Sequence, residues 1–171
     1  MPNKVYNNVQ AHRVIDNERV AEDVTSITLP NIKHPTTKID VSGMAMGVDM
    51  PNTTHLEAME FAIAHNNGVN CRYLAEPGTH KIEVRLARQA YSVAGGEIKS
   101  ESVKYRVTGA HTGTDKGNVE TGNPLGSTDK YSVLRFEEEI DGEISTLIDA
   151  MAGILRWNGK DYTDTVESLL N

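Results

Sequence analysis

Residues 24–30, Val-Thr-Ser-Ile-Thr-Leu-Pro, are rich in β-branched side chains and end in a proline. This composition predicts a β-strand, and Pro30 ends its pairing because proline has no N–H to donate to a ladder. Residues 31–40 are too polar for a core strand, and residues 41–51, Val-Ser-Gly-Met-Ala-Met-Gly-Val-Asp-Met-Pro, return the chain with spaced glycines. We therefore predict a strand followed by a projecting loop or hairpin tip over about residues 30–42.

Extended segments separated by turn residues continue on both sides of this stretch. Apolar and polar side chains alternate at residues 82–86 and again at 103–107, as in half-buried strands. Further strands are predicted at residues 11–15, 131–140 and 143–155, and turns at Asp16-Asn17, Gly95-Gly96, Asp141-Gly142 and Trp157-Asn158-Gly159. Thr163 to Leu170 has the spacing of a short amphipathic helix. The chain is predicted to be a mainly β domain, a β-sandwich or barrel, with one flanking short α-helix.

Three segments are less regular. His55 to Ala64 favours helix by propensity, although its alternation also fits a strand. Asn67 to Glu76 fits a short helix or helical turn that ends at Pro77-Gly78. His111 to Asp129 is glycine-rich, with almost no large apolar residue, and is too long for an ordinary connection. We interpret this last segment as a loop that a neighbouring subunit orders.

The overall composition limits the class of protein. At 171 residues and 18.8 kDa, the chain has the length of one domain, residues 1–171. It carries 17 basic and 24 acidic residues, a net charge of −7, which disfavours tight binding to nucleic acid. The N-terminus lacks the apolar core of a signal peptide, and no segment has the roughly 18 apolar residues of a membrane span. We expect a cytoplasmic, soluble protein that does not insert into membranes.

The sequence offers little catalytic chemistry. Six histidines are scattered without the i, i+4 spacing of a helical metal site: His12, His34, His55, His65, His80 and His111. The single cysteine, Cys71, forms no intramolecular disulfide, and nothing near it indicates an activated thiol. No phosphate-binding glycine loop occurs. We therefore predict no enzyme, no cofactor and no metal.

Three consecutive glutamates lie in the predicted strand 131–140. Because side chains alternate across a strand, Glu137 and Glu139 share one face and Glu138 points to the other. Two interpretations are open at this point: an ordinary solvated face, or a functional acidic face.

Several short motifs occur in a characteristic order: Ser26-Ile27-Thr28-Leu29-Pro30, Val41-Ser42-Gly43-Met44, Met46-Gly47-Val48, Leu56-Glu57-Ala58-Met59-Glu60, Asp141-Gly142-Glu143 and Trp157-Asn158-Gly159-Lys160-Asp161. In order and rough spacing they resemble the major tail tube proteins of contractile-tailed phages, over about residues 10–170. The resemblance favours a strand at His55 to Ala64. The chain departs from the family pattern at residues 111–129, where an acidic, lysine-containing loop is usual.

The resemblance implies a structural protein whose homohexameric rings stack into a tube inside a contractile sheath, through which DNA or another cargo passes without tight binding. It implies a virion component assembled in the host cytoplasm, with the sheath, the initiator or baseplate and the terminator as partners. The implied contacts between subunits or rings are Leu29, Pro30, Lys33, His34, Lys38, Gly43, Met44 and Met46. Glu137 and Glu139 are expected to face the lumen, where negative charge would repel a polyanion.

Two alternatives stay open. The first is the tube of a phage-tail-like bacteriocin or of another contractile injection system, which has the same architecture without a genome. The second is a small soluble enzyme or ligand-binding β domain that uses the glycine-rich loop and Cys71 with His65 or His80. The second predicts a monomer that loses activity on Cys71→Ser.

Overall fold

The computed structural model describes residues 4–6, 11–66, 71–163 and 168–169. Its strands are β1 (Lys4–Tyr6), β2 (Ala11–Asp16), β3 (Arg19–Ala21), β4 (Val24–Thr28), β5 (Thr36–Ile39), β6 (Val48–Pro51), β7 (Glu60–His65), β8 (Thr79–Ser92), β9 (Ile98–Asp115), β10 (Ser127–Ile140), β11 (Glu143–Asp149), β12 (Ile154–Trp157) and β13 (Lys160–Asp161), with a 3₁₀ turn η1 (Arg72–Ala75). The prediction of a mainly β protein is confirmed.

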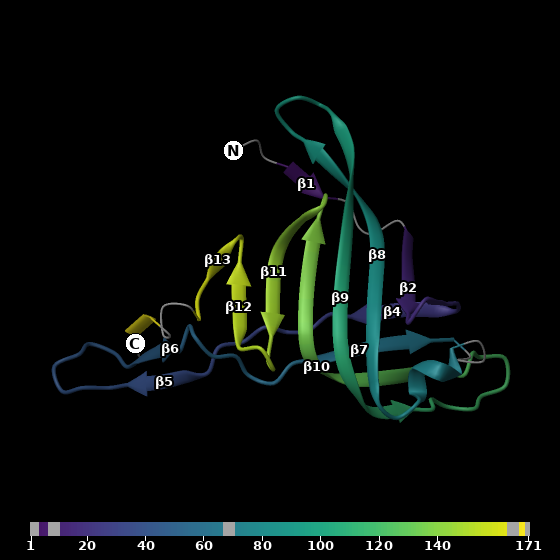
Figure 1. The fold of residues 1–171 in the computed structure, drawn as a ribbon, viewed down its shortest axis with the longest axis horizontal. Coiled ribbons are helices and arrows are strands. Elements are labelled where there is room, and N and C mark those ends of the chain that lie inside the picture. Colours follow the sequence, from purple (N-terminus) through teal and green to yellow (C-terminus); the bar gives the residue numbers. More distant parts are fainter. Residues whose placement is uncertain (1–3, 7–10, 67–70, 164–167, 170–171) are drawn as a thin grey trace.

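The long strands β8, β9 and β10 form the centre of an antiparallel sheet (Figure 1). The sheet runs in the order β13-β12-β11-β10-β9-β8-β2-β3, and β1 also pairs with β8. Hairpin turns set its register. Asp141 and Gly142 both have positive φ, and the predicted turn there is confirmed because Ile140 pairs with Glu143.

A bend in β10 creates a second layer. Residues 127–132 of β10 pair with β7, whereas residues 135–140 pair with β11. The ladder to β9 has irregularities between Lys130 and Tyr131 and between Val133 and Arg135, which bend the strand. β7 carries β4 on its other edge, and these two strands run across the upright strands β8 and β9 in Figure 1.

The hydrophobic core fills the angle between these layers. Phe61 and Ile63 of β7 are fully buried, and the ring of Phe61 lies 6.0 Å from that of Tyr131. The remaining core residues come from β2, β3, η1, β8 to β12 and the residues just before β7 and η1: Val14, Ala21, Met59, Cys71, Leu74, Ile82, Val84, Val107, Val133, Phe136, Ile148 and Leu155. These contacts explain why the region after His55 departs from its helical propensity. The segment from Glu60 is a strand because its apolar residues complete the core, and residues 56–59 form no regular element.

Other predicted boundaries shift. The glycine-rich segment is not a loop throughout, because β9 extends to Asp115 and β10 begins at Ser127. The predicted strand 143–155 is interrupted after Asp149, where a turn with positive φ at Gly153 separates β11 from β12. The helical turn before Pro77 is present as η1. The predicted helix 163–170 lies largely outside the described residues.

Gly117 closes the loop between β9 and β10. Its φ is +74°, and a Cβ atom there would lie 2.0 Å from the carbonyl oxygen of Leu125. We expect Gly117→Ala to lower the free energy of unfolding by roughly 1–3 kcal/mol, since both backbone strain and a clash with backbone are introduced. Gly113→Ala is the matched control, because its Cβ would meet nothing within 4 Å. Urea unfolding measures both, and equal midpoints for the two variants would contradict this expectation.

Candidate functional site

A two-stranded arm projects from the body (Figure 1). This hairpin arm consists of β5, β6 and the connecting residues 40–47, and forms a sheet of its own. It exposes the apolar side chains of Ile39, Val41, Met44, Met46 and Met50, and Met46 is 74% exposed. An isolated hairpin is at best marginally stable in water, and grouped exposed apolar side chains mark interaction surfaces. The arm therefore has the properties of a docking element.

The base of the arm is fixed by hydrogen bonds. Nδ1 of His34 lies 3.1 Å from the carbonyl oxygen of Asn52 and 2.9 Å from that of His55. The amide of Glu57 donates to the carbonyl of Lys33 at 2.9 Å. Lys33 and His34, expected as intersubunit contacts, thus lie at this base, and His34 holds two chain segments together.

The remaining expected contact residues lie in two places. Lys38, Gly43, Met44 and Met46 are on the arm, and Gly43 has a positive φ of 100° in its turn. Leu29 and Pro30 follow β4 next to the body. Leu29 lines an apolar hollow whose other walls are Thr25, Ser26, Ile27, Val84, Leu86 and Tyr105.

One face of the main sheet carries mainly charged side chains. We call it the charged face. It consists of the side chains of β2 and β8 to β13 that neighbour one another in the strand register and point away from the core. Its basic members are Arg13, Lys81, Arg85, Lys104, Arg106, Arg135 and Arg156, and its acidic members are Glu83, Glu137, Glu139, Asp149 and Asp161. Basic side chains therefore outnumber acidic ones on a face of a chain whose net charge is −7.

Arg106 is the centre of this face. Its Nε donates to Glu83 at 3.1 Å, one terminal nitrogen pairs with Glu137, and the other lies 2.8 Å from Glu139. Burial acts to lower the pKa of Arg106, but the hydrogen bonds with the three glutamates outweigh it and raise that pKa. Hydrogen bonds from Lys104 and Arg106 lower the pKa of Glu139. Burial acts to raise the pKa of Glu83, but its hydrogen bonds from Arg85 and Arg106 outweigh it and lower that pKa.

The charged face corrects the interpretation of the glutamates. Glu137 and Glu139 lie on one face, because both pair with Arg106. Glu137 is only 8% exposed and also pairs with Arg135 at 3.2 Å, so it is not a solvated carboxylate. The expected repulsion of a polyanion by negative charge on this face does not follow either, because the basic residues on the same strands exceed the acidic ones.

A cluster of three histidines lies under the other face, of which His65 and His80 are buried and His111 is half-buried. His65, His80 and His111 come from β7, β8 and β9, and the rings of His80 and His111 contact that of Tyr131 with centroids 5.4 and 5.5 Å apart. In the sequence these histidines are scattered. Their sequence separation gives no signal for the cluster, since only the strand register brings them together.

His80 is held by two acceptors. Its Nδ1 lies 2.8 Å from Oδ2 of Asp16 and its Nε2 2.9 Å from the carbonyl oxygen of Glu76. Both nitrogens must donate to satisfy these partners, which requires the imidazolium form. Burial acts to lower the pKa of His80, but the bonds to Asp16 and Glu76 outweigh it and raise that pKa. The side chain therefore pins the end of β2 to the segment that follows η1.

Asp129 joins the other two histidines. Its Oδ2 accepts from Nε2 of His65 at 3.1 Å, and its Oδ1 accepts from the hydroxyl of Thr114 and lies 3.7 Å from His111. Burial acts to raise the pKa of Asp129, but the bonds from His65 and Thr114 outweigh it and lower that pKa. These bonds tie β7, β9 and β10 together where the sheet bends.

Cys71 does not have the properties of a nucleophile. It is buried, its thiol donates to the carbonyl of Glu22, and burial is the main cause that raises its pKa. A thiol in such a site stays protonated, whereas nucleophilic attack requires the thiolate. Among the described residues, no group of three or more His, Cys, Asp or Glu side chains is placed to hold a metal ion.

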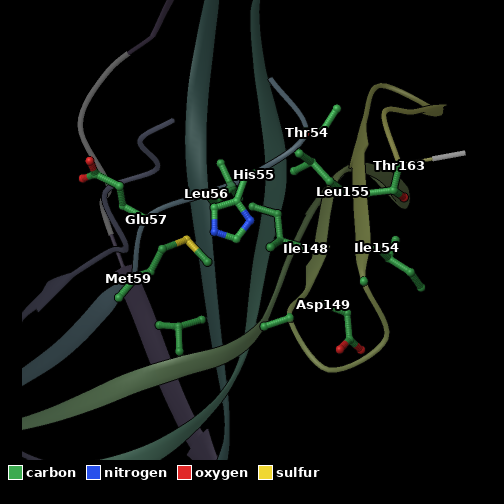
Figure 2. A pocket seen from close by; sticks show the side chains of 14 residues that line it. Thr54, His55, Leu56, Glu57, Met59, Ile148, Asp149, Ile154, Leu155 and Thr163 are labelled. Carbon is green, nitrogen blue, oxygen red and sulfur yellow. The ribbon is translucent and has the colours of Figure 1, made fainter. Parts of the chain in front are cut away.

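A hollow lies between residues 54–59 and the β11–β12 hairpin (Figure 2). Leu56, Met59, Ile148 and Leu155 form its apolar walls. Asp149 lies apart from His55 in Figure 2 and is already engaged, because it pairs with Arg135 at 3.1 Å and accepts the amides of Met151 and Ala152. The hollow is an apolar surface with an ion-paired carboxylate at its rim.

The main sheet ends in open edges. β13 and β3 are the two end strands of this sheet. Among the described strands, β7 is the only partner of β4, so β4 also has an open edge. Such edges present unpaired backbone groups that can join another chain. No helix in the described part of the chain is long and apolar enough to cross a membrane.

Comparison with known proteins agrees with the sequence resemblance. The family model for phage tail tube protein FII matches residues 8–170. One similar solved structure comes from an extracellular contractile injection system, described as the PVC sheath/tube terminator in the extended state. The alignment has a TM-score of 0.52 and 12% identity, and it covers 78% of this chain and 96% of that chain. The search of curated proteins gives no match. Because the family model spans nearly the whole chain, this chain belongs to the phage tail tube protein FII family, which has a structural role in tails.

Proposed function

We propose that the chain is the repeating subunit of the inner tube of a contractile tail, in which homohexameric rings stack and conduct DNA or another cargo. The observation that carries this proposal is the family match over residues 8–170. The shape of the subunit is consistent with it, because a tube subunit needs edges that join sideways and an element that reaches along the axis.

The open edges suit ring closure. A β13 edge of one copy and a β3 edge of the next would continue the antiparallel ladder, so that the closed ring leaves neither edge exposed. The hairpin arm suits contacts between subunits or rings, and its exposed apolar side chains would be buried there. Leu29, Pro30, Lys33 and His34 at the base and Lys38, Gly43, Met44 and Met46 on the arm are the proposed contact residues.

In this assembly the charged face lines the lumen. A sheet that closes into a barrel has an inner and an outer face, and a face of paired charges suits a water-filled channel. Glu137 and Glu139 would then lie in the wall, each already bonded to Arg106. The remaining proposed partners are the sheath, the initiator or baseplate and the terminator, within a virion or related particle assembled in the host cytoplasm.

A second candidate differs in cargo. The similarity to a chain of an extracellular contractile injection system supports the tube of an injection particle or bacteriocin as an alternative to a phage tail. A soluble enzyme that depends on Cys71 is disfavoured by the protonated, buried state of the thiol.

Electron microscopy of the purified protein tests the proposal. At high concentration we expect rings or hollow tubes with a regular axial repeat in negative stain, and a concentration-dependent mass in solution. The tail initiator complex should promote assembly, and Cys71→Ser should not impair it. A monomer that forms neither rings nor tubes, even with the initiator, would rule out the tube assignment.

A further inference from the structure

The charged face has the composition of a polyanion-binding surface, but most of its basic side chains are already paired with carboxylates. Clustered arginines and lysines are the side chains through which proteins bind phosphate backbones. Here Arg85, Lys104, Arg106 and Arg135 each pair with a carboxylate on the same face. Whether such a face binds a polyanion depends on these pairs.

We propose that Glu83, Glu137 and Glu139 shield this basic face, so that it does not bind the phosphate backbone of duplex DNA. We call these residues the shielding carboxylates. The shielding itself follows from the subunit structure. Its consequence for cargo, that a polyanion slides past the wall without being gripped, rests on the proposed function.

The geometry at Arg106 carries the argument. A guanidinium binds phosphate through two parallel N–H donors in its plane. All three nitrogens of Arg106 contact the shielding carboxylates, so three of its five N–H donors are already used and carboxylates balance its charge before a phosphate can approach. The side chain is still 39% exposed, and it would therefore be accessible if the carboxylates were removed.

The neighbouring cations are held in the same way. Lys104 lies 3.0 Å from Glu139, and Arg135 contacts both Glu137 at 3.2 Å and Asp149 at 3.1 Å. Glu137 and Glu139 thus each contact two cations, so that removing these two carboxylates releases several basic side chains at once.

The test compares DNA binding by soluble subunits that differ only in these carboxylates. Each protein is titrated into a labelled 20-base-pair duplex, and binding is measured by fluorescence anisotropy at protein concentrations where light scattering shows no assembly. The three proteins are wild type, the double variant Glu137→Gln/Glu139→Gln and the control Glu57→Gln/Glu143→Gln. The control removes the same charge from exposed positions outside the charged face. Circular dichroism and thermal melting establish that each variant is folded. If the double variant does not fold, the single variant Glu139→Gln takes its place.

We expect the double variant to bind at least about tenfold more tightly than wild type and control at 50 mM salt, with a slope in log[salt] steeper by about 2, because two or more new phosphate contacts form. Adding Arg106→Gln to the double variant should reverse most of the gain. Equal binding by the double variant and the control, or no loss on adding Arg106→Gln, would overturn the shielding proposal. Because the subunits are unassembled, this result is independent of whether they later form tubes.

Discussion

Replacing residues 40–47 of the hairpin arm by Asn-Gly is expected to abolish tube formation and to leave the folded monomer intact. Ile39 and Val48 are direct partners in the ladder between β5 and β6. A two-residue Asn-Gly turn joins directly paired positions of an antiparallel hairpin without altering the register. The replacement therefore removes the tip alone, with Val41, Met44 and Met46.

The size of the effect follows from the apolar surface that is lost. These three side chains are exposed in the subunit, and each would contribute about 1.5–3 kcal/mol if buried against a neighbour. A contact between two copies that buries all three side chains would therefore lose about 5–9 kcal/mol of binding free energy, which is enough to prevent stacking at micromolar concentrations. The free energy of unfolding of the monomer should change by less than about 0.5 kcal/mol, since the tip projects away from the body (Figure 1).

Negative-stain microscopy and analytical ultracentrifugation measure assembly, and urea unfolding measures the stability of the monomer. Met46→Gln should weaken assembly partly. Met151→Gln is the matched control, because Met151 is also highly exposed but lies in the turn between β11 and β12. Tubes of normal length from the tip replacement would show that the arm is not the stacking contact.

The fold was predictable where the pattern was local. Alternation at residues 82–86 and 103–107 identified β8 and β9, and the turn residues Asp141 and Gly142 identified the hairpin that joins β10 to β11. Both signals depend on neighbouring residues and on backbone conformations that only a few residue types adopt. The bend in β10 had no such signal, because it results from bulges at which β10 changes its partner from β7 to β11.

The candidate site was predictable only in part. The sequence placed the expected contact residues of the arm in one polar excursion and predicted that Glu137 and Glu139 share a face. It did not identify Arg106 as their common partner, because the pairing depends on the register between β9 and β10. The histidine cluster was missed for the same reason, since His65, His80 and His111 meet only after three distant strands have paired.

The second large expected effect concerns the pair of His80 and Asp16. Both side chains are buried, and Nδ1 of His80 lies 2.8 Å from Oδ2 of Asp16. His80→Gln keeps a side-chain donor and much of the volume but cannot carry a charge. Because it leaves the carboxylate of Asp16 without its cation, we expect the free energy of unfolding at pH 6 to fall by about 3–5 kcal/mol.

The pH dependence tests whether the proton on His80 is the cause. The pKa of His80 is raised in the folded state, so its contribution is fully present below the ordinary histidine pKa of about 6.5 and is lost as pH rises through the folded-state pKa. The stability difference between wild type and His80→Gln should therefore narrow above pH 6.5. His55→Gln, at an exposed histidine outside the cluster, should follow the wild-type profile.

Unfolding in urea from pH 5.5 to 9 gives the three profiles. The groups that face His80 are Asp16, the carbonyl of Glu76 and the rings of His111 and Tyr131. All of these groups are present in all three proteins, so the difference between wild type and His80→Gln isolates the contribution of His80. A difference that stays constant across the range would mean that His80 contributes through packing and neutral hydrogen bonds. A difference that narrows would show that the protonated form of His80 holds the end of β2 to the segment after η1.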